Sequence, residues 1–461
     1  MACEICTLIY SRIFKVMQVS GHSQIKHSIL YVAKSLINVS AIGVIALMTI
    51  TSSVKASPWL EANDPFLRSS IVLLSDAGKL TAPVNHYPAR WSFYGDDLKR
   101  GISDSKEKGV AIASREVQYS LSSAKLNRGN TSIKFIAGKE QPINSGFGNF
   151  SDDKWGGYTS YEHLDNSYAF RFTTGYRDYN GERDIDWSNS YLSLNAGAWL
   201  FSISNIKRWW GQGWQHNLIL GSFAKTAPDA SLSYLGQNAF LGFWSMETLW
   251  AFPSDSPSDY HSATRLVSKP FSNFEYGLTY QAWFDDLNVG QGAQQSAFDA
   301  KLTLPHIGSL YHSVYTELAS TDNASELGAW MIGWTGSFLD VGKNNVRIVL
   351  EAQQATSAHD NTQWKIENTY QDYPSQNKNV SNTTYQLDSS ESIAIYFQMY
   401  NDHNIGVIYQ QSEMNNQSWN SSQLIYRLPA LAGMLHFGAG YTQNDNSNNE
   451  TNIWSGYEFR I

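Results

Sequence analysis

Cysteine is almost absent from this chain of 461 residues, which contains only Cys3 and Cys6. Both lie in the first 56 residues, which we expect to be removed on export, and neither stands directly after an apolar run, where lipid attachment would place it. The exported chain would then carry no thiol. The sequence therefore excludes disulfide bridges and a cysteine metal site from the mature protein.

Long hydrophobic runs are also missing. The most apolar stretch surrounds residues 41–48 and extends over roughly 12 to 15 residues, whereas a membrane-spanning helix needs roughly 20. It follows the basic residues Lys26 and Lys34 and ends close to Ala56, a small residue that suits signal peptidase. We therefore predict that residues 1–56 are a signal peptide, cleaved near Ala56.

Charged residues are scarce, at 16% of the chain against about 25% in ordinary soluble domains. Residues 1–56 contain five of the 33 basic residues and one of the 41 acidic residues, which leaves 28 against 40, a net charge of −12. Binding to nucleic acid needs concentrated positive charge, so we expect no nucleic-acid partner.

Aromatic residues, in contrast, are abundant, with 16 Trp, 26 Tyr and 21 Phe. Uncharged Asn, Ser and Gly fill much of the remainder. This composition is typical of a transmembrane β-barrel, which has aromatic rings at both membrane interfaces and small polar groups in its lumen. The composition therefore indicates a barrel in the outer membrane of a Gram-negative bacterium.

Residues 57–126 carry helical spacing. Asn63 or Asp64 can cap a helix that has Pro65 in its first turn and stops at Gly78. Two weaker helical patterns follow, at residues 94–100 and 104–126. We interpret this region as a helical unit that packs against a larger part of the protein, because about seventy residues build only a marginally stable core.

The second region comprises residues 127–461. From about Thr131, apolar residues recur at every second position, in segments of about eight to ten residues. In residues 168–176 the aromatic side chains share one face, and Arg171 and Thr173 occupy the other. The same division recurs in residues 274–284 and 346–353. We expect lipid on the apolar faces and a water-filled lumen on the polar ones.

The last residues also alternate, with Ile453, Tyr457 and Phe459 against Glu458 and Arg460. Outer-membrane barrels close by pairing such a terminal strand with the first. About 330 residues, at roughly 18 to 20 per strand and connection, predict about 16 to 18 antiparallel strands. Outer loops are predicted at residues 177–189 and 369–384, and periplasmic turns at residues 165–166 and 196–198.

Motifs for catalysis or metal binding are missing. The histidines have no paired metal spacing, and neither a nucleophile motif nor a phosphate-binding glycine loop occurs. The acidic loop at residues 178–186 fails as an EF-hand, because Tyr176 and Trp187 occupy the first and twelfth positions, where carboxylates are needed. We therefore expect no enzyme, no cofactor and no metal.

A tryptophan-rich motif is the most specific feature of the sequence, and it comprises Arg208, Trp209, Trp210, Gln212 and Trp214. Four further segments carry distinctive motifs, at residues 58–60, 64–68, 73–78 and 224–233. On these motifs, the helical unit and the first third of the barrel resemble the Wzi family of capsule-assembly outer-membrane proteins. The family pattern has proline between the two glycines of the motif, where this chain has Gln212.

The resemblance implies an 18-stranded barrel with a helical bundle at its periplasmic mouth, and a protein that holds exported polysaccharide at the cell surface. The five motif residues would then offer sugars a platform at the outer end of a strand hairpin, since sugar C–H faces pack on aromatic rings and hydroxyls bind polar groups. Alternatively, these tryptophans belong to the interfacial girdle or pack a loop.

The functional hypothesis is thus a lectin-like outer-membrane protein that anchors capsular or extracellular polysaccharide. Its expected partners are that polysaccharide and outer-membrane lipid, with the export machinery as a further candidate, and we expect a monomer. A porin for small solutes or sugars is the alternative, suggested by the lumen-facing Arg171, Arg347 and Glu351. An enzyme acting on lipid or glycan is a third class, for which the sequence offers no motif.

Overall fold

The structure is a computed structural model. It describes residues 59–99, 107–125, 130–140, 146–165, 167–179, 181–218, 220, 226–253, 258–285, 294–321, 323–356, 387–414, 417–444 and 449–460. The predicted signal peptide, both cysteines and the predicted outer loop at residues 369–384 lie outside these ranges.

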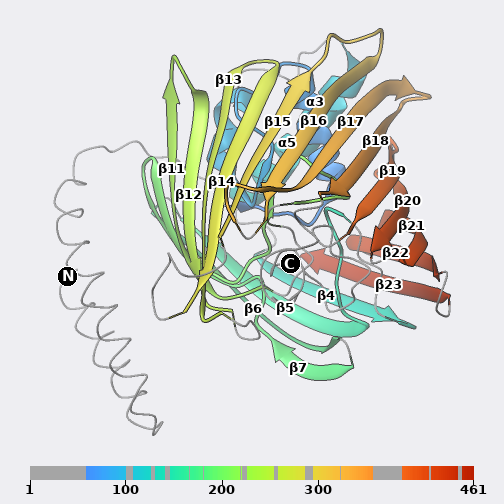
Figure 1. Ribbon diagram of the computed structural model, residues 1–461. Helices are drawn as coiled ribbons and strands as arrows, with labels where there is room; N and C mark the ends of the chain where they lie inside the picture. Colours follow the sequence, from blue (N-terminus) through green and yellow to red (C-terminus); the bar gives the residue numbers. More distant parts are fainter. Residues whose placement is uncertain are drawn as a thin grey trace, which may run out of the picture. The chain divides into compact units, whose positions relative to one another are not determined.

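Within these ranges, nineteen strands close into one antiparallel barrel (Figure 1). They are β4 (Thr131–Gly138), β5 (Trp155–Leu164), β6 (Tyr168–Tyr179), β7 (Glu182–Asp186), β8 (Tyr191–Ala196), β9 (Trp199–Ser204), β11 (Asp229–Asn238), β12 (Gly242–Ala251), β13 (Tyr260–Phe271), β14 (Phe274–Phe284), β15 (Gln294–Thr303), β16 (Leu310–Ser320), β17 (Leu327–Val341), β18 (Asn344–Ala355), β19 (Ser389–Gln398), β20 (Asn404–Met414), β21 (Gln417–Ala430), β22 (Gly433–Asn444) and β23 (Glu450–Arg460). Strand β8 pairs with the first part of β6, and β7 pairs with its second part. The two short strands therefore share one position in the ring, and the nineteen strands fill 18 positions.

The ring closes between its last and first strands. β23 pairs antiparallel with β4, in a register that runs from Trp454 opposite Gly138 to Arg460 opposite Ser132. This confirms the predicted closed antiparallel barrel and its terminal strand. Closure leaves neither strand with an open edge along this register, which a membrane-embedded sheet requires.

The alternation of side chains predicted for the wall is confirmed. In β14, whose bounds match the prediction, Leu278 and Tyr280 are exposed on the outside, whereas Glu275, Thr279 and Gln281 are buried inside. The expectation of water around the inward charges is wrong for Glu275, which accepts a hydrogen bond from the N–H group of Val84 inside the barrel.

The two ends of the barrel differ. Strand pairs such as β13–β14, β17–β18 and β21–β22 are joined by very short turns, and we call the end where they lie the short-turn end. In the β17–β18 turn, Gly342 and Lys343 both have positive φ, as two-residue hairpins require. The longer connections lie at the opposite end. Residues 177–189, predicted as an outer loop, are partly the β6–β7 hairpin, because Gly175 to Tyr179 pair with β7.

The N-terminal elements contact the inside of the wall. They are β1 (Trp59–Leu60), α3 (Pro65–Asp76), β2 (His86–Tyr87), β3 (Ala89–Arg90), the 3-10 helix η1 (Trp91–Phe93), α4 (Gly95–Lys99) and α5 (Lys108–Lys125). As predicted, α3 begins at Pro65 behind an Asp64 cap, whose carboxylate accepts hydrogen bonds from the N–H groups of Phe66 and Leu67. α3 packs against α5, β16 and β19, and α5 against β17 (Figure 1).

Ion pairs and hydrogen bonds fix these helices to strand residues near the short-turn end. Asp76, the last residue of α3, lies 3.1 Å from the Lys301 ammonium of β15. Gln398, at the end of β19, donates to the carbonyl of Phe66. None of the described helices is long and apolar enough to cross a membrane.

Candidate functional site

The tryptophan-rich motif lies inside the barrel. The connection between β9 and β11 turns inward, and its β10 (Trp209–Trp210) pairs with β2 of the N-terminal region. The relative exposure of Trp209 and Trp210 is 0%, and that of Trp214 is 1%. The motif thus belongs to a connection at the end opposite the short turns between strands, but it folds into the lumen and is not exposed there, because its backbone completes an internal sheet.

Arg208 joins the motif to the wall through two carboxylates. Its guanidinium binds Asp229 of β11 through both terminal nitrogens, at 2.5 and 3.0 Å, and lies 3.3 Å from Glu247 of β12. His86 of β2 contacts the other oxygen of Glu247 at 2.7 Å. All four side chains are buried. Paired and hydrogen-bonded charges of this kind position a buried segment, since removing one partner leaves an uncompensated charge.

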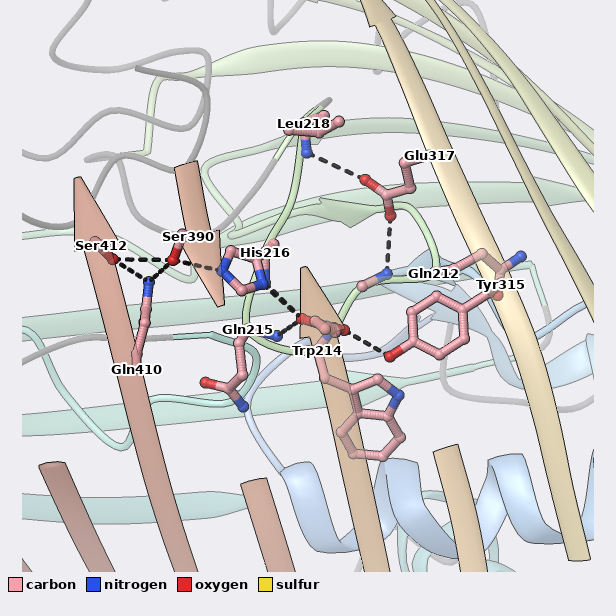
Figure 2. Close-up of polar contacts among 12 residues, drawn as sticks. Gln212, Trp214, Gln215, His216, Leu218, Tyr315, Glu317, Ser390, Gln410 and Ser412 are labelled. Carbon is pink, nitrogen blue, oxygen red and sulfur yellow. Dashed lines mark hydrogen bonds and ion pairs between the residues drawn. The ribbon is translucent and has the colours of Figure 1, made fainter. Parts of the chain in front are cut away.

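Two glutamates of the wall hold the backbone that follows (Figure 2). Glu351 of β18 accepts hydrogen bonds from the N–H groups of Trp214, Gln215 and His216, at 2.5 to 2.9 Å. Glu317 of β16 accepts from the N–H groups of Gly213 and Leu218. These carboxylates satisfy backbone donors that would otherwise be buried without partners.

Side chains extend this network on both sides (Figure 2). The hydroxyl of Tyr315 donates to Glu351 at 2.6 Å, and the ring of His216 bridges Glu351 and Ser390. Gln212 donates to Asp299 of β15 at 3.1 Å. The loop from Gly211 to Leu218 is thus attached to β15, β16, β18 and β19.

Helix α3 reaches the same loop through Arg68. The guanidinium donates to the carbonyl oxygens of Gln212 and Gly213, both at 2.9 Å. It also lies between two rings, 4.3 Å from the centroid of Phe147 and 4.5 Å from that of Trp214. The N-terminal region, the motif and the wall therefore form one interior network.

The structure brings the five predicted site residues together, and it buries all of them. Such burial fits the alternative in which these tryptophans pack a loop, and it does not fit an interfacial girdle, whose rings would face the membrane. Sequence reasoning missed their partners Arg68, His86, Glu247 and Glu317. For Glu351, alternation along its strand correctly indicated the lumen, but it could not show which segment occupies the lumen there.

A separate cavity of about 770 Å³ lies elsewhere in the lumen. Residues of β4–β6 and β21–β23 line one side, and β1, the start of α3 and the loop before β5 line the other. A smaller space of about 170 Å³ adjoins it and shares Asn149, Phe150 and Ser160 among its lining residues. We call the two together the luminal cavity.

The arginines in the luminal cavity are paired with carboxylates. Arg427 of β21 lies 2.6 Å from Asp64, and Arg171 of β6 contacts Glu61 and Glu162. Burial acts to raise the pKa of Asp64, but Arg427 and the backbone N–H groups at the start of α3 hold it below the ordinary value. Asp64 therefore serves both as a helix cap and as an ion-pair partner.

The fold and its interior define a class of protein, a closed antiparallel β-barrel with an apolar outer face and part of its lumen occupied by its own chain. Among solved structures it shares its fold with Wzi, an outer-membrane protein of Escherichia coli involved in group 1 capsule assembly and described as a carbohydrate-binding β-barrel. The TM-score is 0.75 at 16% sequence identity, over 87% of this chain and 99% of that one.

Two barrels of Pseudomonas aeruginosa are more distant. OccD3 (OpdP) matches with a TM-score of 0.43 at 10% identity, over 72% of this chain and 90% of its own. OccK3 (OpdO) matches at 0.48 and 9%, over 72% and 94%. No family model and no curated protein matches the sequence.

Proposed function

We propose that this protein is a non-enzymatic, lectin-like barrel of the Gram-negative outer membrane that anchors exported capsular or extracellular polysaccharide to the cell surface. The observation that carries the proposal is the fold shared with Wzi over 87% of the chain and nearly the whole of that carbohydrate-binding barrel. The tryptophan-rich motif supports it by sequence resemblance. The export machinery is a further proposed partner, and we propose that the barrel acts as a monomer.

The orientation in the membrane follows from the two ends of the barrel. Outer-membrane barrels have short periplasmic turns and longer extracellular loops. We therefore propose that the short-turn end faces the periplasm and that residues 57–126 form a helical bundle or plug there, after signal-peptide cleavage near Ala56. The longer connections would then meet the polysaccharide outside the cell.

The porin alternative is less well supported. It was suggested by lumen-facing charges, yet Arg347 donates from two nitrogens to the hydroxyl and carbonyl of Ser69 in α3, both at 2.9 Å. Glu351 is occupied by the tryptophan-rich loop. Arg347 and Glu351 thus hold the interior segments, whereas Arg171, the third of these charges, lines the luminal cavity and is paired with Glu61 and Glu162.

A deletion strain tests the proposal. Loss of the gene should leave polysaccharide synthesis intact, while cell-bound polymer falls and polymer in the medium rises. Unchanged cell-bound polymer, in a strain whose surface polymer is measurable, would contradict the anchoring function. Purified protein in planar bilayers tests the alternative, because a porin gives stable, large single-channel conductance and an occluded barrel does not.

A further inference from the structure

The luminal cavity has a solvent-accessible mouth at the short-turn end. Its lining includes Tyr119 of α5, which is 76% exposed, and Ala432 in the short turn between β21 and β22. From there the lining continues to Trp454 of β23, which is only 5% exposed. A volume of about 770 Å³ falls within the range of roughly 300 to 1,000 Å³ that is usual for small-molecule sites.

The walls combine aromatic rings with uncharged polar groups. Phe150, on the loop between β4 and β5, stacks parallel to Trp454, with 5.7 Å between the ring centroids. Ser132 and Ser160 face the cavity from β4 and β5, where their hydroxyls pair at 2.5 Å. Among the described residues, the Nδ2 atom of Asn149 is buried without a hydrogen-bond partner. Phe150 also stacks on His436, with 4.1 Å between the ring centroids, so the open aromatic ring of the cavity is that of Tyr119 at its mouth. An open aromatic face beside donors and acceptors is suited to sugar rings and their hydroxyls.

Charge narrows the ligand class further. The larger part of the cavity is lined by four cations and four carboxylates, together with His436; the charged residues are Lys134, Arg171, Arg427, Arg460, Glu61, Asp64, Glu162 and Glu458. Arg460 lies 3.3 Å from Glu458, the other two arginines are paired as described above, and the Lys134 ammonium donates to the carbonyl oxygen of Phe150. An anionic ligand would require cations without such partners, so the balance favours an uncharged one.

We infer that the luminal cavity is a saccharide-binding site that takes a short, electrically neutral stretch of glycan from the short-turn end. The ligand class rests on the proposed function, whereas the position and neutrality rest on the cavity itself. With the proposed orientation, this site faces the periplasm, on the opposite side of the membrane from surface attachment.

Filling the cavity tests the inference. Ser160→Trp places an indole in the cavity from β5, and Thr159→Trp, its control, places the same side chain on the exposed outer face of the same strand. The probes are neutral gluco-, galacto- and manno-oligosaccharides of four sugars, with tetragalacturonate as the acidic counterpart, titrated calorimetrically into detergent-solubilised protein. Thermal unfolding verifies that both variants are folded.

At least one neutral probe should bind the wild type and the Thr159→Trp variant, and bind Ser160→Trp at least tenfold more weakly. The inference is overturned if no neutral probe binds, if tetragalacturonate binds more tightly than every neutral probe, or if Ser160→Trp leaves the affinity unchanged. A reduced probe affinity with normal cell-bound polymer would separate this site from surface anchoring. A deletion strain with unchanged polymer would contradict the anchoring function alone.

Discussion

The guanidinium carbon of Arg68 lies 4.5 Å from the ring centroid of Trp214, although 146 positions separate the two residues in the chain. The same guanidinium donates to two carbonyl oxygens of the loop that carries Trp214. This contact joins the N-terminal helix to the tryptophan-rich motif without involving the wall. The interior of the barrel is therefore held together directly, as well as through the strands around it.

Replacing Arg68 should destabilise the folded barrel. Arg68→Met keeps much of the side-chain volume but removes two buried, charge-assisted hydrogen bonds, so we expect a loss of about 2–4 kcal/mol. Thermal unfolding in detergent measures it. Arg115→Met is the control, because Arg115 is exposed on α5 and bonds only within its own helix among the contacts described. Equal unfolding temperatures for the two variants would show that the Arg68 contacts contribute no stability.

Glu351→Gln should loosen the tryptophan-rich loop. A neutral amide has one acceptor oxygen and an added donor, so it cannot replace a carboxylate that accepts from three backbone N–H groups and from Tyr315. We expect a loss of about 3–5 kcal/mol and faster proteolysis of the loop by an added protease. Glu391→Gln is the control, because Glu391 lies on the neighbouring strand β19, opposite Ala352, and its side chain is exposed. If Glu351→Gln matched the control in unfolding temperature and in rate of cleavage, Glu351 would not hold the tryptophan-rich loop in place.

Stability should depend on pH through Glu116 of α5. Burial raises the pKa of Glu116 to about 7, although Ser70 donates to its carboxylate at 2.5 Å. The folded state thus holds a proton that the unfolded state releases near the ordinary value of about 4.5. The stabilising contribution is full below about pH 4.5 and is lost as the pH rises through 7.

The unfolding temperature of the wild type should therefore fall relative to that of Glu116→Gln between pH 5 and 8. The glutamine variant keeps a neutral group at this position at every pH, so its own curve lacks this component. Parallel curves for the two proteins across this range would contradict the assignment to Glu116.

The proposed orientation can be tested by labelling, because the mature chain should contain no thiol. Ser272→Cys places a thiol in the short β13–β14 turn, and Ser325→Cys places one in the connection between β16 and β17 at the other end; both positions are exposed. A membrane-impermeant maleimide should label only Ser325→Cys on intact cells, and both variants after permeabilisation. The reverse pattern would invert the orientation.

Local sequence signals predicted the wall and the first helix well. Alternation located β14 with its correct bounds, and the Asp64 cap with Pro65 located the start of α3. The alternation of apolar and polar residues shows only which face of the strand a residue occupies. It placed Glu351 toward the lumen but could not show its hydrogen-bond partners. The inward path of the tryptophan-rich motif depends on contacts between residues more than a hundred positions apart, such as Trp214 with Glu351. No local pattern encodes such contacts.

The pairing of β23 with β4 also has a consequence for the order in which the barrel is assembled. One edge of strand β4 stays unpaired until β23, at the other end of the chain, is in place, whereas the β2–β10 sheet needs no residue after Trp210. The interior can thus be assembled inside an open, curved sheet and enclosed afterwards. A truncated chain without β23 would leave the edges of β4 and β22 unpaired, a state open to pairing with other chains and to capture by chaperones.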